Sequence, residues 1–583
     1  MLRRVRSRLV AALCAAAFVW LPLAGCDGKR KRVEPAPVDM SVTETTSSDS
    51  APVEAPGTAM ALEEGRMGKV GSDRAEGQYK MRARADAIAA ARTAGVLGNG
   101  PIGAGTGVVS GFDDMDMHGG LLPGDRFRDH GVNPWIDAAT DRLSTFAADV
   151  DTASYVVTRR LMRAGGLPPV AAVRVEEFVN YFHYDYPTPS PAGGPFAVAM
   201  DAAPSPLAPD RLIFRVGVAT RARAAHERPP MHLVFLVDTS GSMQEPDRLP
   251  LAQRALRMVV EQMRGGDTIA LATYAGDTRL VLPASGIDRQ AAILEAIDAL
   301  SAGGGTAMGS GLATAYTEAA KTLDAGGQTR VIVVSDGDAN VGPQEADDLL
   351  KIIAAQARRG VTLTTIGVGV GNYRDDTMEQ LADRGDGANF YIDGLDQARR
   401  VFVEQLGANL ELVAQDVKLQ VDFDPAVVAR YRLVGYENRD LADEDFRDDK
   451  VDAGEVGAGH QVTALYELEL RPGAAPTTSL ATVRIRHKQP RGTEATEASY
   501  AFDPAHRAAR FDAAPADLRF AFAAAAFADR LRGAEEAAAV SLADVAAIAR
   551  GAAGADPDRL ELVGLIDTAA RLQGAAVVAA KGD

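Results

Sequence analysis

The residues best suited to chemistry in this sequence are the oxygen-bearing side chains of one short loop. Asp238, Ser240 and Ser242 follow the apolar run 232–237 within the stretch Asp-Thr-Ser-Gly-Ser. Carboxylate and hydroxyl oxygens suit hard divalent cations, and Mg²⁺ takes oxygen ligands in octahedral geometry while keeping several waters. The pattern therefore indicates a cation site at the end of a buried strand. A site that leaves one coordination position open could accept a carboxylate from another molecule.

Two further loops downstream have the composition that such a site needs. A glycine-rich loop occupies 303–309, and the apolar run 331–334 ends in Ser335-Asp336. The three loops, in this order, resemble the metal-ion-dependent adhesion site of von Willebrand factor type A domains. The resemblance implies five metal ligands, namely Asp238, Ser240, Ser242, Thr306 and Asp336.

The expected ligand set would leave the metal electrophilic. Three hydroxyls carry no charge, so two aspartates acting mainly through water would allow an acidic residue of a protein partner to complete the shell. The ion would also help to keep Asp238 and Asp336 ionised. We expect Mg²⁺, with Mn²⁺ or Ca²⁺ as alternatives. The simpler interpretation is three polar turns whose serines and aspartates cap helices.

These loops need strands that end at one edge of a sheet. Apolar runs predict strands at 232–237, 268–274, 278–282, 329–334, 361–367 and 389–392. Periodic apolar positions predict helices at 248–264, 288–300, 309–323, 344–359, 375–384 and 394–409. This alternation is typical of a mostly parallel sheet covered on both faces. We therefore expect a doubly wound α/β domain of the type A fold over 229–410, with ligands at the carboxyl ends of its strands.

After about residue 411 the apolar pattern changes to a period of two. Strands are predicted at 413–421, 431–436, 461–470, 480–487 and 498–502, with a long acidic loop at 437–459. Two earlier strands, 196–200 and 211–219, have no other sheet to join, and their edges need covering. We expect the type A domain to be inserted into a β-sandwich-like domain, of which 411–510 is the later part. A helical tail should follow at 511–583.

The N-terminus has the pattern of a bacterial lipoprotein signal. Four arginines precede an apolar stretch at 9–21, which is short for a membrane span, and Leu-Ala-Gly-Cys26 follows. The resemblance implies a signal peptide over 1–25 and an acylated Cys26 as lipid anchor. Asp27 resembles a signal for retention in the inner membrane. We therefore expect the periplasmic face of the inner membrane, with the outer membrane as the alternative.

Residues 26–135 are polar and glycine-rich, which predicts a disordered tether. Helices and strands should follow over 136–228, beginning with a helix at 156–164. A second helix is predicted after Pro169, with an apolar face that runs from Val175 to Phe182. Asp149 and Asp151 could form a second carboxylate site, although turn and capping roles fit them better. The stretches 144–155 and 173–186 resemble a family of bacterial envelope proteins that carry a central type A domain. That resemblance extends over most of 144–575.

Charge and motifs narrow the function further. The formal net charge of −17 becomes −21 when the four arginines of the signal leave, which disfavours nucleic acid as a partner. The sequence contains no H-E-x-x-H pair and no G-x-S-x-G elbow, so we do not expect an enzyme. We expect a tethered binding protein. The alternatives are an envelope assembly or scaffolding factor with a structural metal and, less favoured, a metal-dependent hydrolase. The oligomeric state stays open.

Overall fold

The computed structural model describes residues 127–580, apart from 191–193, 207, 209, 223–224, 306, 338–342, 370–372, 406–407, 409, 452 and 539. The expected signal, Cys26, Thr306 and most of the expected tether lie outside the described residues. The chain divides into two compact units, 1–99 and 100–583, and everything described below belongs to the second. Within the described part, none of the helices has the length and apolar character of a membrane span.

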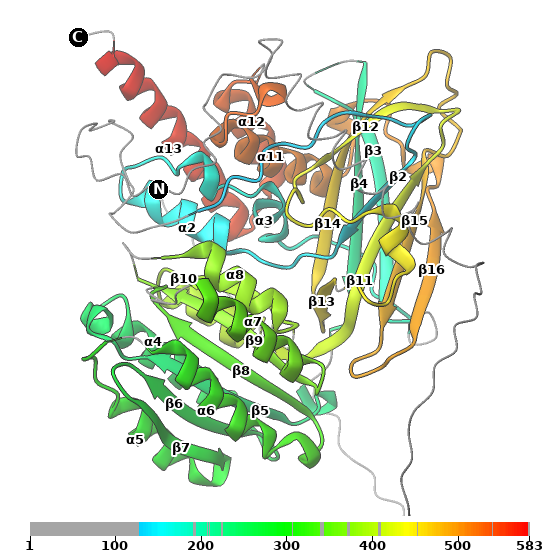
Figure 1. The fold of residues 1–583 in the computed structure, drawn as a ribbon. Coiled ribbons are helices and arrows are strands. Elements are labelled where there is room, and N and C mark those ends of the chain that lie inside the picture. Colours follow the sequence, from blue (N-terminus) through cyan, green and yellow to red (C-terminus); the bar gives the residue numbers. More distant parts are fainter. Residues whose placement is uncertain are drawn as a thin grey trace, which may run out of the picture. The chain divides into compact units, whose positions relative to one another are not determined.

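A six-stranded sheet carries the predicted loops at its edge (Figure 1). In spatial order its strands are β10 (Asn389–Ile392), β9 (Val361–Val368), β8 (Gln328–Ser335), β5 (Met231–Asp238), β6 (Thr268–Tyr274) and β7 (Thr278–Gly286). Only β7 runs antiparallel to its neighbour. The central strand β5 is buried along its whole length, as its apolar run predicts. The predicted mostly parallel α/β fold is confirmed.

Helices cover both faces of this sheet. One face packs against α4 (Leu249–Glu261), α5 (Gln290–Asp298) and α9 (Leu395–Arg399). The other face packs against α6 (Met308–Ala320), α7 (Pro343–Ala357) and α8 (Asp375–Arg384). The predicted helix at 394–409 is shorter than expected, because α9 passes at Arg400–Glu404 into a π-helical turn.

The remaining strands form two antiparallel sheets that enclose a common core. The first sheet contains, in spatial order, β1 (Ile136–Asp137), β12 (Val428–Val434), β14 (Gln461–Leu470), β4 (Arg211–Thr220) and β3 (Phe196–Pro204). The second sheet contains, in spatial order, β13 (Gly454–Gly457), β11 (Leu412–Phe423), β15 (Ala481–Lys488) and β16 (Ala495–Ala501). β2 (Leu143–Ala147) also pairs with β11. Aromatic rings from both sheets, including Phe214 and Phe423, meet in the core between them.

Pairing across the sequence confirms that the type A domain is inserted. β4 precedes the domain and pairs with β14, which follows it, from Arg211 opposite Glu469 to Ala219 opposite Gln461. β2 and β11 are joined in the same way. A strand on each side of the insertion therefore belongs to each sheet.

Both chain connections reach the type A domain at the end of the sheet where β5 and β8 begin. The incoming connection ends at Met231, which lies opposite Gln328 at the start of β8. The Gln328 side chain donates to the carbonyl oxygen of Leu412 at 2.8 Å and accepts from the Leu412 amide at 2.9 Å, where the outgoing chain enters β11. This edge is opposite the one that carries the predicted metal loops.

Several local details differ from the sequence-based expectation. The strands β1 and β2 were not predicted, and the loop predicted at 437–459 contains a 3₁₀ turn at Asp443–Arg447 and the strand β13. The helix predicted after Pro169 is the short α3 (Val175–Asn180). It packs with α2 (Ala153–Arg163) and the tail helices α11 (Ala516–Leu531), α12 (Leu542–Ala553) and α13 (Pro557–Ala580).

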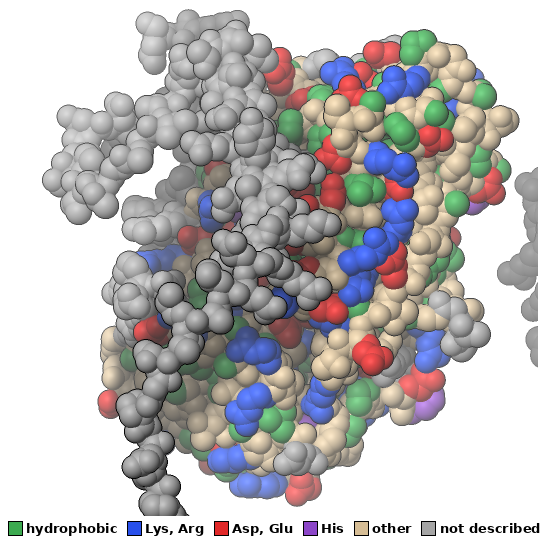
Figure 2. All heavy atoms as spheres, turned by 45° about the vertical axis from the view of Figure 1, so that its right-hand side comes forward, with side chains coloured by type: hydrophobic (Ala, Val, Ile, Leu, Met, Phe, Trp, Pro, Cys, Tyr) green, Lys and Arg blue, Asp and Glu red, His purple; other side chains and the backbone are tan. Residues whose placement is uncertain are grey.

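The solvent face of β15 carries a row of cationic side chains. Arg484, Arg486 and Lys488 alternate with buried residues along the strand. Each has a carboxylate partner: Arg484 contacts Asp422 at 2.7 Å, Arg486 contacts Asp449 at 2.5 Å and Lys488 contacts Asp416 at 2.7 Å. Figure 2 shows Lys and Arg side chains interspersed with Asp and Glu on one face of the molecule. The charge of the β15 row is therefore balanced locally.

Candidate metal centre

Asp238 is the last residue of β5, and its carboxylate organises the loop that follows. The backbone N–H of Ser240 donates to Asp238 Oδ1 at 2.8 Å, a turn that an aspartate readily makes with the residue two positions on. The Thr239 N–H donates to the carbonyl oxygen of Tyr274 at the end of β6. Asp238 is fully buried. The loop is therefore fixed from both sides at the carboxyl end of the sheet.

The two serines of the loop have the spacing of metal ligands. Ser240 Oγ and Ser242 Oγ lie 3.0 Å apart. Two adjacent oxygens of an octahedron with Mg²⁺–O bonds of 2.0–2.1 Å lie about 2.9 Å apart. A 3₁₀ turn at Gly241–Gln244 gives the backbone the bend that places both hydroxyls together. These residues fit a divalent cation, with Ser240 and Ser242 as neighbouring ligands.

The end of β8 brings the second aspartate to the same edge. Ser335 Oγ donates to Asp238 Oδ2 at 3.0 Å, so the ends of the two neighbouring strands are bonded directly. Asp336 is 1% exposed. The side chain of Arg248, just before α4, donates from Nη1 to Asp336 Oδ2 at 2.6 Å and to the Ser242 carbonyl oxygen at 2.7 Å. Asp238, Ser242 and Asp336 thus belong to one contiguous cluster.

The glycine-rich loop also reaches this edge. The Gly303 N–H donates to the Thr239 carbonyl oxygen at 2.7 Å, and the Gly241 N–H donates to the Gly304 carbonyl oxygen at 3.1 Å. Gly304 has a φ of +98°, and a Cβ there would lie 3.1 Å from the backbone nitrogen of Gly276. The glycines therefore allow the close approach of this loop to the other two. Thr306, the fifth expected ligand, lies outside the described residues.

The site combines burial with negative charge. Burial raises the pKa of Asp238, and the neighbouring Asp336 raises it further, whereas hydrogen bonds from Ser240 and Ser335 act in the opposite direction. A divalent cation would reverse this tendency, because it stabilises the ionised carboxylates. The donor set therefore favours a cation that is bound by hydroxyls and screened by carboxylates.

Sequence reasoning missed two residues of this cluster. Ser335 was visible as the residue before the strand-ending aspartate, and a hydroxyl at the end of a buried strand was the available signal. Arg248 carries no such signal, because an arginine at the start of an amphipathic helix is ordinary. Its role depends on the tertiary approach of α4 to the end of β8.

Comparison with protein-family models identifies three regions of the chain. Residues 232–403 match the von Willebrand factor type A domain, residues 123–215 match a model described as von Willebrand factor, and residues 408–572 match the model "Uncharacterized protein YfbK, C-terminal". A search of curated proteins finds the Escherichia coli protein YfbK, which is 39% identical over 469 residues, covering 76% of this chain and 81% of that protein. This chain belongs to the YfbK family.

Two further proteins are similar to part of the chain. The Synechocystis protein sll0103 is 25% identical over 232 residues, which cover 39% of this chain and 54% of that protein. Among solved structures, a von Willebrand factor type A protein from Catenulispora acidiphila has 19% identity and a TM-score of 0.41, covering 64% of this chain and 89% of its own. Type A domains often mediate protein–protein interaction through a metal-ion-dependent adhesion site.

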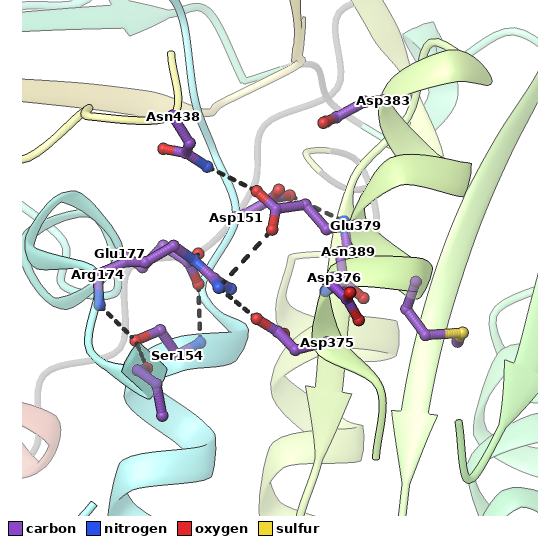
Figure 3. A network of polar contacts seen from close by, with 12 residues as sticks. Asp151, Ser154, Arg174, Glu177, Asp375, Asp376, Glu379, Asp383, Asn389 and Asn438 are labelled. Carbon is purple, nitrogen blue, oxygen red and sulfur yellow. Dashed lines mark hydrogen bonds and ion pairs between the residues drawn. The ribbon is translucent and has the colours of Figure 1, made fainter. Parts of the chain in front are cut away.

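A second polar cluster in this YfbK-family chain lies beside α8 (Figure 3). Oxygens of Asp149, Glu176 and Glu177 lie within 4.8 Å of one another, and all three residues are buried. The Asp151 N–H donates to Asp149 Oδ1 at 2.9 Å, so Asp149 has the turn role that the sequence favours. Asp151 accepts from the Asn389 N–H at 2.8 Å. The cluster therefore joins the segment before β3 to the start of β10.

Two arginines hold this cluster together. Arg174 contacts Glu177 and Asp375, the first residue of α8. Arg439, in the loop after β12, contacts Asp149 at 3.2 Å, Asp151 at 2.9 Å and Asp383 at 2.7 Å.

Carboxylates outnumber the guanidinium groups in this cluster, which favours the protonated form of its buried glutamates. Burial raises the pKa of Glu176 to about 7 and that of Glu177 to about 8, and the charge of Asp149 contributes to both shifts.

Proposed function

We propose that this chain is a lipid-anchored extracytoplasmic protein that binds a protein partner through a divalent cation. The cation would be held by Asp238, Ser240, Ser242, Thr306 and Asp336, and Mg²⁺ is the expected ion. The observation that carries the proposal is the 3.0 Å approach of the Ser240 and Ser242 hydroxyls beside Asp238, at an edge that Asp336 shares.

Each described residue has a separate task in this proposal. The hydroxyls of Ser240 and Ser242 offer neutral oxygens, so they bind a cation without cancelling its charge. Asp238 is held by Ser335 and by its own loop, so its carboxylate keeps a fixed orientation. A bound cation would supply the positive charge that attracts a carboxylate of the partner. The chemistry of the site therefore favours an acidic residue as the ligand from outside.

The arrangement favours binding over catalysis. The histidine of the central strand, His232, lies at the end of β5 opposite the site. Its ring nitrogens contact the Thr268 hydroxyl and the Gly326 carbonyl oxygen, at 2.9 and 2.8 Å. It is therefore not positioned to serve Ser240 as a general base, which a serine nucleophile would need.

The location follows from the N-terminal sequence. An acylated Cys26 would anchor the chain, and residues 26–135 would let the folded part reach away from the bilayer. Asp27 favours the periplasmic face of the inner membrane. A Cys26→Ser variant should leave the membrane fraction and retain the fold of the remaining chain. Persistent membrane association of that variant would argue against a lipid anchor at this residue.

A crosslinking pull-down from native membranes tests the binding function. The full chain should capture its partner with Mg²⁺ and lose it in EDTA, and Asp238→Ala should lose it in both buffers. Thr239→Ala is the matched control, because it removes a hydroxyl from the same loop that contacts the Tyr274 carbonyl oxygen instead. Equal capture by Asp238→Ala in EDTA would remove the metal from the interaction and favour the sandwich surface of a scaffolding factor.

A further inference from the structure

Arg248 occupies a position where its charge opposes a bound cation. Its side chain is 10% exposed, and its Nη1 lies 2.6 Å from Asp336 Oδ2, one of the oxygens expected to hold the metal. The same nitrogen donates to the carbonyl oxygen of Ser242. A hydrogen-bonded ion pair in a buried position is stronger than the same contact in water. A cation at the site would have to share Asp336 with this guanidinium or displace it.

The stem of Arg248 is held against the backbone of Gly369. Gly369 has a φ of +78°, and a Cβ there would lie 2.3 Å from Arg248 Cγ, so only glycine leaves room for the stem. The Gly369 carbonyl oxygen accepts hydrogen bonds from Arg160 Nη1, at 2.8 Å, and from the Tyr391 hydroxyl. Arg160 belongs to α2, which lies outside the type A domain. The place of Arg248 is therefore tied to the docking of α2.

We propose that Arg248 is a built-in competitor of the divalent cation, kept on Asp336 by a contact chain that runs from Arg160 through Gly369. This inference rests on the proposed metal site and adds a regulation of its affinity. Without a cation, the guanidinium balances the negative charge of Asp336. Undocking of α2 frees the Gly369 segment, lets Arg248 move and raises the affinity for the cation.

The test measures Mn²⁺ binding to the full chain by isothermal titration calorimetry, with free Mn²⁺ counted by electron paramagnetic resonance. Arg248→Gln removes the charge and retains a donor for the Ser242 carbonyl oxygen. It should bind Mn²⁺ about tenfold more tightly, which is the effect of losing one hydrogen bond between charged groups. Arg160→Gln, remote from the metal, should tighten binding in the same direction by a smaller factor.

The control is Arg254→Gln, which removes a positive charge from an exposed position of α4, the helix that follows Arg248. Arg254 Nε donates to the Pro250 carbonyl oxygen at 3.2 Å. It should leave the affinity unchanged. Circular dichroism in EDTA verifies that each variant is folded, and Arg160→Gln carries the test if Arg248→Gln does not fold.

The outcomes separate the regulation from the site itself. Unchanged or weaker Mn²⁺ binding by Arg248→Gln would overturn the competition and show that Arg248 instead supports Asp336. The proposed metal site would still stand in that case if the unaltered chain binds Mn²⁺ and Asp238→Ala does not. If the unaltered chain, Arg248→Gln and Asp238→Ala all fail to bind Mn²⁺, both the site and its regulation are wrong.

Discussion

Arg439 donates from Nη2 to Asp151 Oδ2 at 2.9 Å, although the two residues are 288 positions apart in the sequence. Asp151 lies between β2 and α2, whereas Arg439 lies in the loop after β12. The same guanidinium contacts Asp383 of α8 at 2.7 Å. A single side chain therefore links the segment before the insertion, the inserted domain and the segment after it.

Removal of this link should destabilise the fold. Arg439→Ala leaves several buried carboxylates without their cation, and the loss of one partner of a buried ion pair costs about 3–5 kcal/mol of unfolding free energy. Urea denaturation of the full chain measures the change. Arg447→Ala is the control, because its ion pair with Glu497 is exposed at the arginine and should cost less than about 1 kcal/mol. Equal losses in the two variants would contradict the linking role of Arg439.

The raised pKa values of the buried glutamates in this cluster predict a pH dependence of stability. Glu176 keeps its proton in the folded chain to about pH 7, whereas the ordinary value in an unfolded chain is 4.5. The folded state therefore binds more protons between these values, and its unfolding free energy falls as the pH rises through this window. Glu177, with a pKa of about 8, extends the fall to higher pH.

Glu176→Gln should flatten this dependence, since the amide does not titrate. The melting temperature of the metal-free chain, measured between pH 5 and pH 8, gives the slope. Asp512→Asn, which changes an exposed carboxylate paired with Arg510, should reproduce the slope of the unaltered chain. A slope that Glu176→Gln leaves intact would assign the pH dependence to other groups.

A cation that binds only the folded chain should raise its stability. At a free Mg²⁺ concentration of 100 times the dissociation constant, the unfolding free energy increases by about 2.7 kcal/mol. Thermal melts with Mg²⁺ and with EDTA should differ for the unaltered chain and coincide for Asp238→Ala. A Mg²⁺ shift of equal size in both would place the stabilising ion elsewhere. A shift without metal-dependent capture of a partner would favour the structural role of the metal.

Replacement of two glycines by alanine should change the stability in opposite directions. A Cβ at Gly217, on β4, would lie 2.2 Å from the ring of Tyr186, whose hydroxyl is 2.8 Å from Thr463 Oγ1. Gly217→Ala should therefore cost about 1–3 kcal/mol through overpacking. Gly551→Ala in α12 meets no atom within 4 Å and should stabilise by about 0.5–1 kcal/mol, because alanine favours a helix. Chemical denaturation of both variants should show opposite signs.

The sequence predicted those parts of the fold that local pattern determines. The alternating strands and helices of the type A domain follow from apolar periodicity. That the strands before the domain share a sheet with those after it was expected because strands at 196–219 had no other sheet to join, but the pairing of β4 with β14 comes from the structure alone. Short strands such as β1 carry too few residues for a periodic signal. The length of α3 was overestimated because its apolar face continues to Phe182, whereas the helix ends at Asn180. Apolar side chains just beyond a helix end can extend the pattern of its buried face.

In the candidate site, too, local sequence pattern predicts some residues and contacts between distant segments determine others. Asp238, Ser240 and Ser242 were predictable from a motif after a strand, and Asp336 from the order of the loops. Arg248 and the cluster around Arg439 depend on contacts between distant segments, for which a single sequence gives no local pattern. The placement of Thr306 stays a prediction.

The entry and exit of the inserted domain have a mechanical consequence. Met231 and Leu412 lie beside the start of β8, so a force on the opposite end of the sheet would be shared between the two chain connections to the sandwich. A domain joined by a single linker can rotate about that linker. The two connections should restrict rotation of the inserted domain, so that a force from the proposed partner would reach the sandwich in a defined direction.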